Sequence, residues 1–354
     1  MPAEPRITLL GPQRDPRLPQ VVRARGLRGG RFALVTAGWR DRENDDALLS
    51  ELLGGRTVNL QLWTRMQQLW EEDPELDAAD RERRRVLTEL QELYVIGLQQ
   101  SVEAVHRITE HRPRVPAVRE AALEDVLSIL RSLDERHLER VNDVHQTFYE
   151  RYQPQHRPAV VRGRFAVGQL IAGCDAVVIP GGHVGVLLGA LHLFNLGPAL
   201  GYVHEEEQPD GSVVGSPRVY RPVIAWGAGA MALTERVFLF HDFSVVAPGI
   251  SELLMEGLCL TKGLIALPSA KDRLDLRDLP STRSLVLRSA PLVPVLLDVG
   301  TQVVLGEDGR LPAGARVLGP DGRARKLAPE DPGGPQGAVE PQDDEPAPDQ
   351  EEPA

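Results

Sequence analysis

The sequence predicts a mixed α/β protein whose mostly parallel sheet carries helices on both faces. Two observations lead to this fold class. From about residue 158 onward, short apolar segments alternate with glycine-rich turns and helical patterns. These apolar runs are also continuous, which is typical of strands buried on both faces. The predicted strands are Ile7–Leu10, Phe32–Ala37, Ala176–Pro180, Val223–Trp226, Val237–Phe240, Leu264–Leu267, Ser284–Leu287 and Val293–Leu297. Turn residues between Thr301–Leu305 and Ala315–Leu318 further predict a terminal hairpin.

Residues 58–152 have a different texture, because their apolar side chains recur at intervals of three and four residues. The segment Leu60–Trp70 predicts a leading helix, and Asp73-Pro74 predicts the cap and first turn of the next one. Prolines 113 and 116 predict the break between two long helices. We therefore expect a helical hairpin inserted into the α/β body.

Four segments follow from these patterns. Residues 1–57 supply the first strands of the core, and residues 58–152 form the helical insertion. Residues 153–328 complete the core, and residues 329–354 form an acidic, proline-rich tail.

The net charge of −11 is concentrated in that tail. Residues 331–354 hold eight Asp and Glu, no Lys or Arg, six prolines and no aromatic residue, so we expect disorder there. Removing those eight charges leaves −3 for the rest of the chain. A nearly neutral body gives no reason to expect nucleic-acid binding.

Composition also argues against several other classes. No apolar run approaches the ~20 residues of a membrane-crossing helix, and the first thirty residues lack the apolar core of a secretory signal. Two cysteines, Cys174 and Cys259, cannot build a disulfide framework or a four-thiolate zinc site. We expect a cytoplasmic protein without cofactor or metal, and we attribute the Glu103/His106 and Asp134/His137 spacings to salt-bridged helices.

The segment Pro222–Met231 predicts a buried strand that runs through small residues into a helix. This is the layout of a nucleophile elbow, in which the central residue is held on a strained turn. Here the central residue is Gly227, followed by Ala228 and Gly229. The alternative interpretation is an ordinary glycine-rich turn between a strand and a helix.

A second strand, within Asp175–His183, ends in Gly181-Gly182. Such a pair can turn backbone N–H groups outward, which suits a carboxylate or an oxyanion. His183 follows directly and is either a base or a structural loop residue.

Taken in order, the region from Asp175 to Leu305 resembles the peptidase family of cyanophycinase and alpha-aspartyl dipeptidase. The matching segments are Val178–Gly182, Ala225–Ala230, Gly263–Ser269 and Leu297–Thr301. The resemblance covers about 130 residues and implies a class I glutamine amidotransferase-like fold. Residues 60–152 have no counterpart in that family.

The resemblance also implies a position for each member of a catalytic triad. The nucleophile falls on Gly227, the histidine base falls near Ser269, and the acidic member falls near Asp242. Only the acid is retained, whereas a serine hydrolase needs all three roles. We therefore expect a non-catalytic descendant that binds a peptide or carboxylate at Gly181, Gly182, His183, Ala228 and Gly229. Regulation or assembly, through a protein partner or self-association of helices 60–152, fits the same expectation.

Two alternatives remain open. One is an active serine-type peptidase on acidic or aspartyl peptides, with Ser269 as a displaced nucleophile and His241 or His183 as its base. In that case Asp242 orients His241, whereas Cys259, in an apolar run, is expected to be buried. The other alternative is a scaffold that oligomerises through the helical hairpin.

Overall fold

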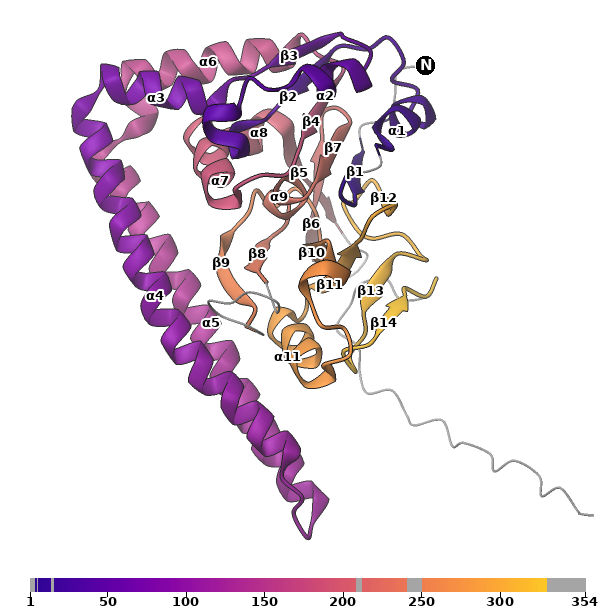
Figure 1. Cartoon of the computed structure of the whole chain (residues 1–354). Helices are drawn as coiled ribbons and strands as arrows, with labels where there is room; N and C mark the ends of the chain where they lie inside the picture. The colour runs from indigo at the N-terminus through magenta and orange to yellow at the C-terminus, as the bar shows by residue number, and fades with distance from the viewer. Residues whose placement is uncertain (1–3, 5, 14–15, 208–211, 241–249, 330–354) are drawn as a thin grey trace, which may run out of the picture.

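The main element of the fold is a six-stranded sheet, seen in a computed structural model that describes residues 4, 6–13, 16–207, 212–240 and 250–329 (Figure 1). The acidic tail predicted to be disordered therefore lies outside the described residues, apart from residue 329. The strand order is β12-β1-β7-β4-β2-β3, with β12 antiparallel and the other five strands parallel. These strands are β1 (Ile7–Leu10), β2 (Phe32–Leu34), β3 (Thr57–Asn59), β4 (Ala176–Ile179), β7 (Val223–Trp226) and β12 (Gln302–Val304).

Helices cover both faces of this sheet, which explains the continuous apolar runs. On one face, α1 (Leu18–Ala24) and α2 (Ala47–Leu52) pack on side chains such as Phe32 and Val178. The other face joins a larger core that includes α7 (Val184–Leu193) and α9 (Ala228–Ala232). The short helix α8 (Leu196–Leu200) follows α7. The predicted α/β class with a parallel-rich sheet is confirmed.

Three smaller sheets complete the core. The four-stranded sheet has the order β10-β11-β13-β14, and two hairpins pair β5 with β6 and β8 with β9. Their bounds are β5 (Gly201–Glu207), β6 (Val213–Val219), β8 (Arg236–Leu239), β9 (Glu252–Glu256), β10 (Leu264–Pro268), β11 (Val293–Leu297), β13 (Arg316–Leu318) and β14 (Ala324–Lys326). Helices α10 (Ala270–Arg273) and α11 (Leu279–Ser289) lie between β10 and β11 in the chain.

Two predicted strand assignments are wrong. The segment Ser284–Leu287 lies inside α11, where Thr282, Leu285 and Arg288 are buried at a spacing of three. The terminal hairpin does not form either, because β12 pairs with β1 whereas β13 pairs with β11 and β14. Both segments are short and apolar, so their local pattern does not decide between helix and strand or between strand partners. Capping by Asp278 favours the helix at Ser284–Leu287, and pairing with strands distant in sequence separates β12 from β13.

The strand predicted at Phe32–Ala37 is also shorter than expected. It ends at Leu34, and the 3-10 helix η1 (Ala37–Arg42) begins three residues later. The strand predicted at Val237–Phe240 is present as β8, but it pairs with β9 and does not join the main sheet.

The helical hairpin forms as predicted. It consists of α4 (Pro74–Glu110) and α5 (Pro116–Tyr152), preceded by α3 (Leu62–Glu72) and followed by η2 (Pro154–His156) and α6 (Pro158–Ala172). The Asp73 carboxylate caps α4 by accepting a hydrogen bond from the Leu76 N–H at 3.1 Å. Figure 1 shows both helices running along the core and projecting beyond it. No helix in the described ranges combines the length and the apolar composition needed to cross a membrane.

A buried ion pair joins this hairpin to the core. Asp134 on α5 receives two hydrogen bonds from the Arg288 guanidinium of α11, at 2.9 and 2.8 Å. The Tyr94 hydroxyl of α4 donates to Asp134 at 2.7 Å and accepts from Arg288 at 2.9 Å. Both charged side chains are 2% exposed or less. Burial raises the pKa of Tyr94, so the phenol keeps its proton and remains a donor to Asp134.

We expect Asp134→Ala to lower the free energy of unfolding by about 3–5 kcal/mol, because it leaves the Arg288 charge buried without a partner. Glu135→Ala is the matched control, since Glu135 is the exposed neighbour on the same helix and should change stability by less than about 0.5 kcal/mol. Urea unfolding of the full chain measures both. Equal effects of the two substitutions would show that the ion pair does not anchor the hairpin.

Candidate functional site

The carboxyl ends of β2, β4 and β7 meet at one edge of the main sheet, because these strands are parallel and adjacent. In open α/β sheets this edge is the usual place for ligands. The loops that leave it carry Gly38, Gly181, Gly182 and Gly227. We call this edge the strand-end site.

Gly227 has the backbone geometry of a nucleophile elbow. It stands between β7 and α9 with φ 56° and ψ −131°, a region that glycine enters far more easily than other residues. A Cβ placed on it would lie 2.9 Å from the Gly181 Cα. Apart from its chain neighbours, only backbone atoms of Gly181 come within 4 Å of that Cβ among the described residues. The elbow geometry is therefore present, and the Gly181 Cα crowds the position that the first side-chain atom of a nucleophile would take.

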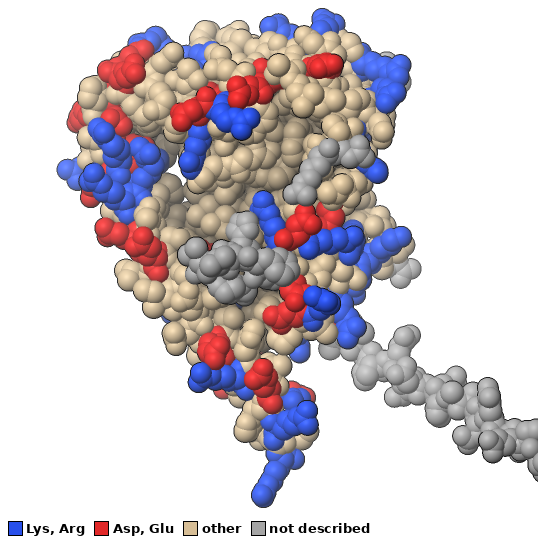
Figure 2. Space-filling model, viewed as in Figure 1, with Lys and Arg blue, Asp and Glu red and all other residues tan. Residues whose placement is uncertain are grey.

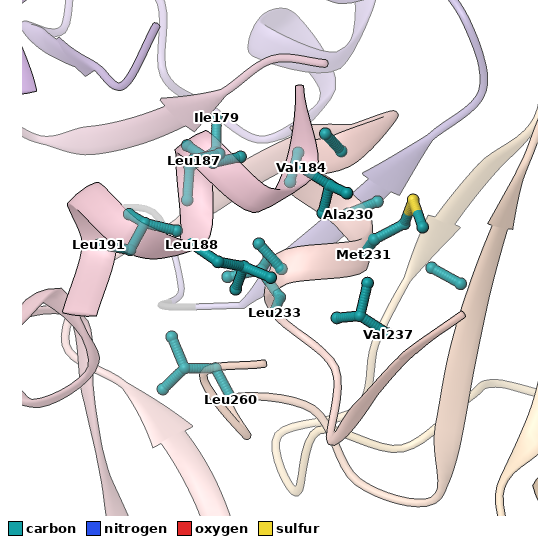
Figure 3. Packing of buried hydrophobic residues seen from close by; sticks show 14 of the residues in the cluster. Ile179, Val184, Leu187, Leu188, Leu191, Ala230, Met231, Leu233, Val237 and Leu260 are labelled. Atoms are coloured by element: carbon teal, nitrogen blue, oxygen red, sulfur yellow. The ribbon is translucent and has the colours of Figure 1, made fainter. Parts of the chain in front are cut away.

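Ala228 and Gly229 are buried where α9 begins. A Cβ on Gly229 would lie 2.0 Å from the Ile179 carbonyl oxygen, so the helix can approach β4 only without a side chain there. Figure 3 shows the result, with Val184 of α7 beside Ala230 of α9 in a tightly packed apolar layer. The small-residue run therefore serves close packing.

Gly182 and His183 are held by the loop after β2. The His183 N–H donates to the Gly38 carbonyl at 2.8 Å, and a Cβ on Gly182 would meet Gly38 backbone atoms at 2.6 Å. The His183 Nδ1 accepts a hydrogen bond from the Val186 N–H at 3.2 Å and so caps α7. Burial and the nearby Arg40 charge lower the pKa of His183, which keeps its imidazole neutral in this capping role.

Arg40 is a residue of this edge that sequence reasoning missed. Its φ of 57° and ψ of −125° match those of Gly227, although Arg40 has a side chain. The conformation is imposed from both sides. The Trp39 indole donates to the Gly181 carbonyl at 2.8 Å, and the buried Glu43 carboxylate accepts the N–H groups of Trp63 and Thr64 at 2.8 Å. The only sequence signal was an aromatic and a charged residue directly after a strand-end glycine.

Ser269 ends β10 in the neighbouring sheet, with φ 57° and ψ 41°. Its N–H donates to the Leu297 carbonyl at 2.9 Å, while its hydroxyl has no hydrogen-bond partner among the described residues. Beside it, the buried Asp298 accepts from the Lys271 N–H at 2.8 Å and pairs with Arg316 at 3.0 Å. Asp298 thus ties the ends of β10 and β11 to β13. The proposed base His241 and acid Asp242 lie outside the described residues.

The remaining residues singled out in the sequence are Cys259 and the histidines of the helical hairpin. Cys259 is exposed, contrary to the expected burial, but partial desolvation and the charges of Glu256 and Glu235 raise the pKa of its thiol to about 11. In the hairpin, His137 stacks on Tyr94 with ring centroids 4.1 Å apart, and the His106 Nε2 lies 3.2 Å from the Ser281 hydroxyl. No group of three or more His, Cys, Asp or Glu gathers for a metal within the described ranges. On the face in Figure 2, acidic and basic side chains are interspersed.

Comparisons with known proteins give little more. No model of a protein family matches the sequence, and no curated protein matches it. One solved structure, described as a crystal structure of a peptidase from an acI-B1 Actinobacterium, aligns over 93% of this chain and 96% of that chain. The identity is 13% and the TM-score is 0.39. At such values, function has to be argued from this chain's own residues.

We expect Gly227→Ser to lower the free energy of unfolding by about 2–4 kcal/mol, because the strained dihedrals and the contact with Gly181 both oppose a side chain. Gly168→Ala is the control, since that helical glycine has open space around its Cβ position and should gain up to about 1 kcal/mol. Chemical denaturation compares them. A Gly227→Ser protein as stable as wild type would show that the elbow can open.

Arg40→Gly should raise the free energy of unfolding by about 1 kcal/mol, because glycine adopts the Arg40 dihedrals without strain. Arg42→Gly, which changes an exposed arginine of the same turn, should instead cost about 0.5–1 kcal/mol. Thermal unfolding midpoints measure both. A loss of stability in Arg40→Gly would mean that its side chain contributes more than its backbone strain costs.

Proposed function

We propose that this chain is a non-catalytic binding protein built on an amidotransferase-like α/β fold. The observation that carries the proposal is that the elbow position is Gly227, which has no side chain, and that a Cβ there would lie only 2.9 Å from the Gly181 Cα. In the implied triad this removes the attacking group, and a hydrolase of this kind loses about 10⁶ in rate without it.

The other positions support the same proposal. The His183 Nδ1 accepts the capping hydrogen bond of α7 and its backbone N–H donates to Gly38. The neutral ring therefore carries its proton on Nε2, which can donate to a ligand but cannot act as a general base. The Ser269 side chain has no base within hydrogen-bond distance among the described residues, although a nucleophile needs one. Binding of a peptide or carboxylate end would then use the exposed Gly182 backbone and the Arg40 charge beside His183.

A serine-type peptidase with a rewired site is the alternative. Ser269 would be its nucleophile, and His241 with Asp242 would supply the base and its orienting acid. The free Ser269 hydroxyl is the observation in its favour. Assembly through the helical hairpin is compatible with either function, since the hairpin projects beyond the core (Figure 1).

We expect a fluorophosphonate probe to leave the wild-type chain unlabelled, because no activated serine is present at the strand-end site. Gly227→Ser should also stay unlabelled, since the added hydroxyl has no base. Ser269→Ala is the matched control for background labelling. Intact-protein mass spectrometry detects the adduct. Labelling of wild type that disappears in Ser269→Ala would overturn the non-catalytic proposal in favour of the rewired peptidase.

A further inference from the structure

A cavity of about 390 Å³ lies where the helical hairpin meets the α/β core. Its walls come from α4 and α5 on one side, and from η2, α6, α7 and the end of β9 on the other. This volume is within the ordinary range for small-molecule sites. None of its lining residues belongs to the strand-end site. The cavity exists only because the hairpin is present.

Arg164 of α6 brings an uncompensated charge to the cavity wall. Its Nε–H donates to the Leu193 carbonyl at 2.8 Å, which orients the half-buried guanidinium. Its terminal nitrogens have neither a hydrogen bond nor a carboxylate partner within the part of the chain that the structure describes. A guanidinium held at one nitrogen, with its terminal fork free, matches the geometry of a carboxylate or a phosphate.

The opposite wall presents a second arginine that is firmly positioned. Arg83 pairs with Asp80, and its guanidinium lies 4.3 Å from the centre of the Phe148 ring. A terminal nitrogen of Arg83 lies 3.4 Å from the His145 Nδ1, which must act as acceptor because a guanidinium only donates. Burial, Arg83 and His192 lower the pKa of His145 to about 3, so this ring adds no charge at neutral pH. Asp80 pairs with both Arg83 and Arg84, whereas Arg164 has no carboxylate partner in the part of the chain that the structure describes.

The remaining polar wall is neutral and under-satisfied. Three polar atoms of the lining, Arg83 Nε, His145 Nε2 and Gln155 Oε1, are buried without a hydrogen-bond partner among the described residues. The side chains of Asn142 and Asn195 line the exposed part of the cavity. The acidic residue of the lining, Glu256, is exposed. Native proteins rarely leave buried polar groups unpaired, and a polar ligand would provide the missing partners.

We propose that this hairpin–core cavity binds a small anion carrying a carboxylate or a phosphate, with Arg164 as its charge partner and the Asn142 and Asn195 amides as neutral contacts. The ligand touches both the insertion and the core, so its binding stabilises their docked arrangement. This inference does not depend on whether the strand-end site is catalytic.

The test titrates the full chain with inorganic phosphate or with succinate, against sodium chloride of matched ionic strength at pH 7. The readouts are the thermal unfolding midpoint and the affinity measured by isothermal titration calorimetry. We expect at least one anion to raise the unfolding midpoint by several degrees above the chloride control. A rise with phosphate alone identifies a phosphate-bearing ligand, and a rise with succinate alone identifies a carboxylate.

Arg164→Gln should lower the affinity for whichever anion binds by on the order of tenfold or more, because a charge-assisted hydrogen-bond pair is lost. Arg162→Gln is the matched control, since Arg162 lies on the same helix, is exposed and pairs with Glu72. Arg164→Lys, which keeps the charge and loses the fork, should give an intermediate affinity, and circular dichroism verifies that all variants fold. Equal responses of wild type and Arg164→Gln, or no response to either anion, would overturn the proposal.

Discussion

Direct contact between glycine backbones is the constraint on which the strand-end site depends. Gly181 lies against Gly227, Gly182 lies against Gly38, and Gly229 lies against the Ile179 carbonyl. These contacts bring the loops of β2, β4 and β7 closer than any side chain would permit. Beside these contacts, the hydrogen bonds of Trp39 and Glu43 hold Arg40 in a conformation that is costly for a residue with a Cβ.

The buried Arg288–Asp134 pair fixes the helical insertion against the core. Removing two charges from water costs desolvation free energy. The hydrogen bonds that both partners make offset this cost, and they fix the position of the hairpin. Arg288 satisfies Asp134, the Tyr94 hydroxyl and the Ser251 carbonyl at once. The pair lies near the middle of both helices, and the hairpin–core cavity lies closer to the start of α4, where Arg83 lines it.

Local patterns were sufficient to predict the long helices and the buried strands, because helical periodicity and continuous apolar runs report burial directly. They failed where partners far apart in sequence decide, as for Gln302–Val304, which pairs with β1. The elbow at Gly227 was predictable from its small residues, but the residue that crowds its Cβ position is Gly181, forty-six residues earlier. Arg40 and the hairpin–core cavity were out of reach, since strain and enclosed volume are tertiary properties.

The distribution of unpaired polar groups separates the two sites. At the strand-end site, His183 caps α7 through its Nδ1, and its backbone N–H donates to Gly38. At the hairpin–core cavity, the Arg83 Nε, His145 Nε2 and Gln155 Oε1 atoms are buried without a partner among the described residues. A fold retains unsatisfied polar groups at a cost in stability, so they mark the place where something else supplies the missing bonds. By this criterion the buried polar atoms without partners favour the hairpin–core cavity, more than the strand-end site, as the place where we expect a ligand.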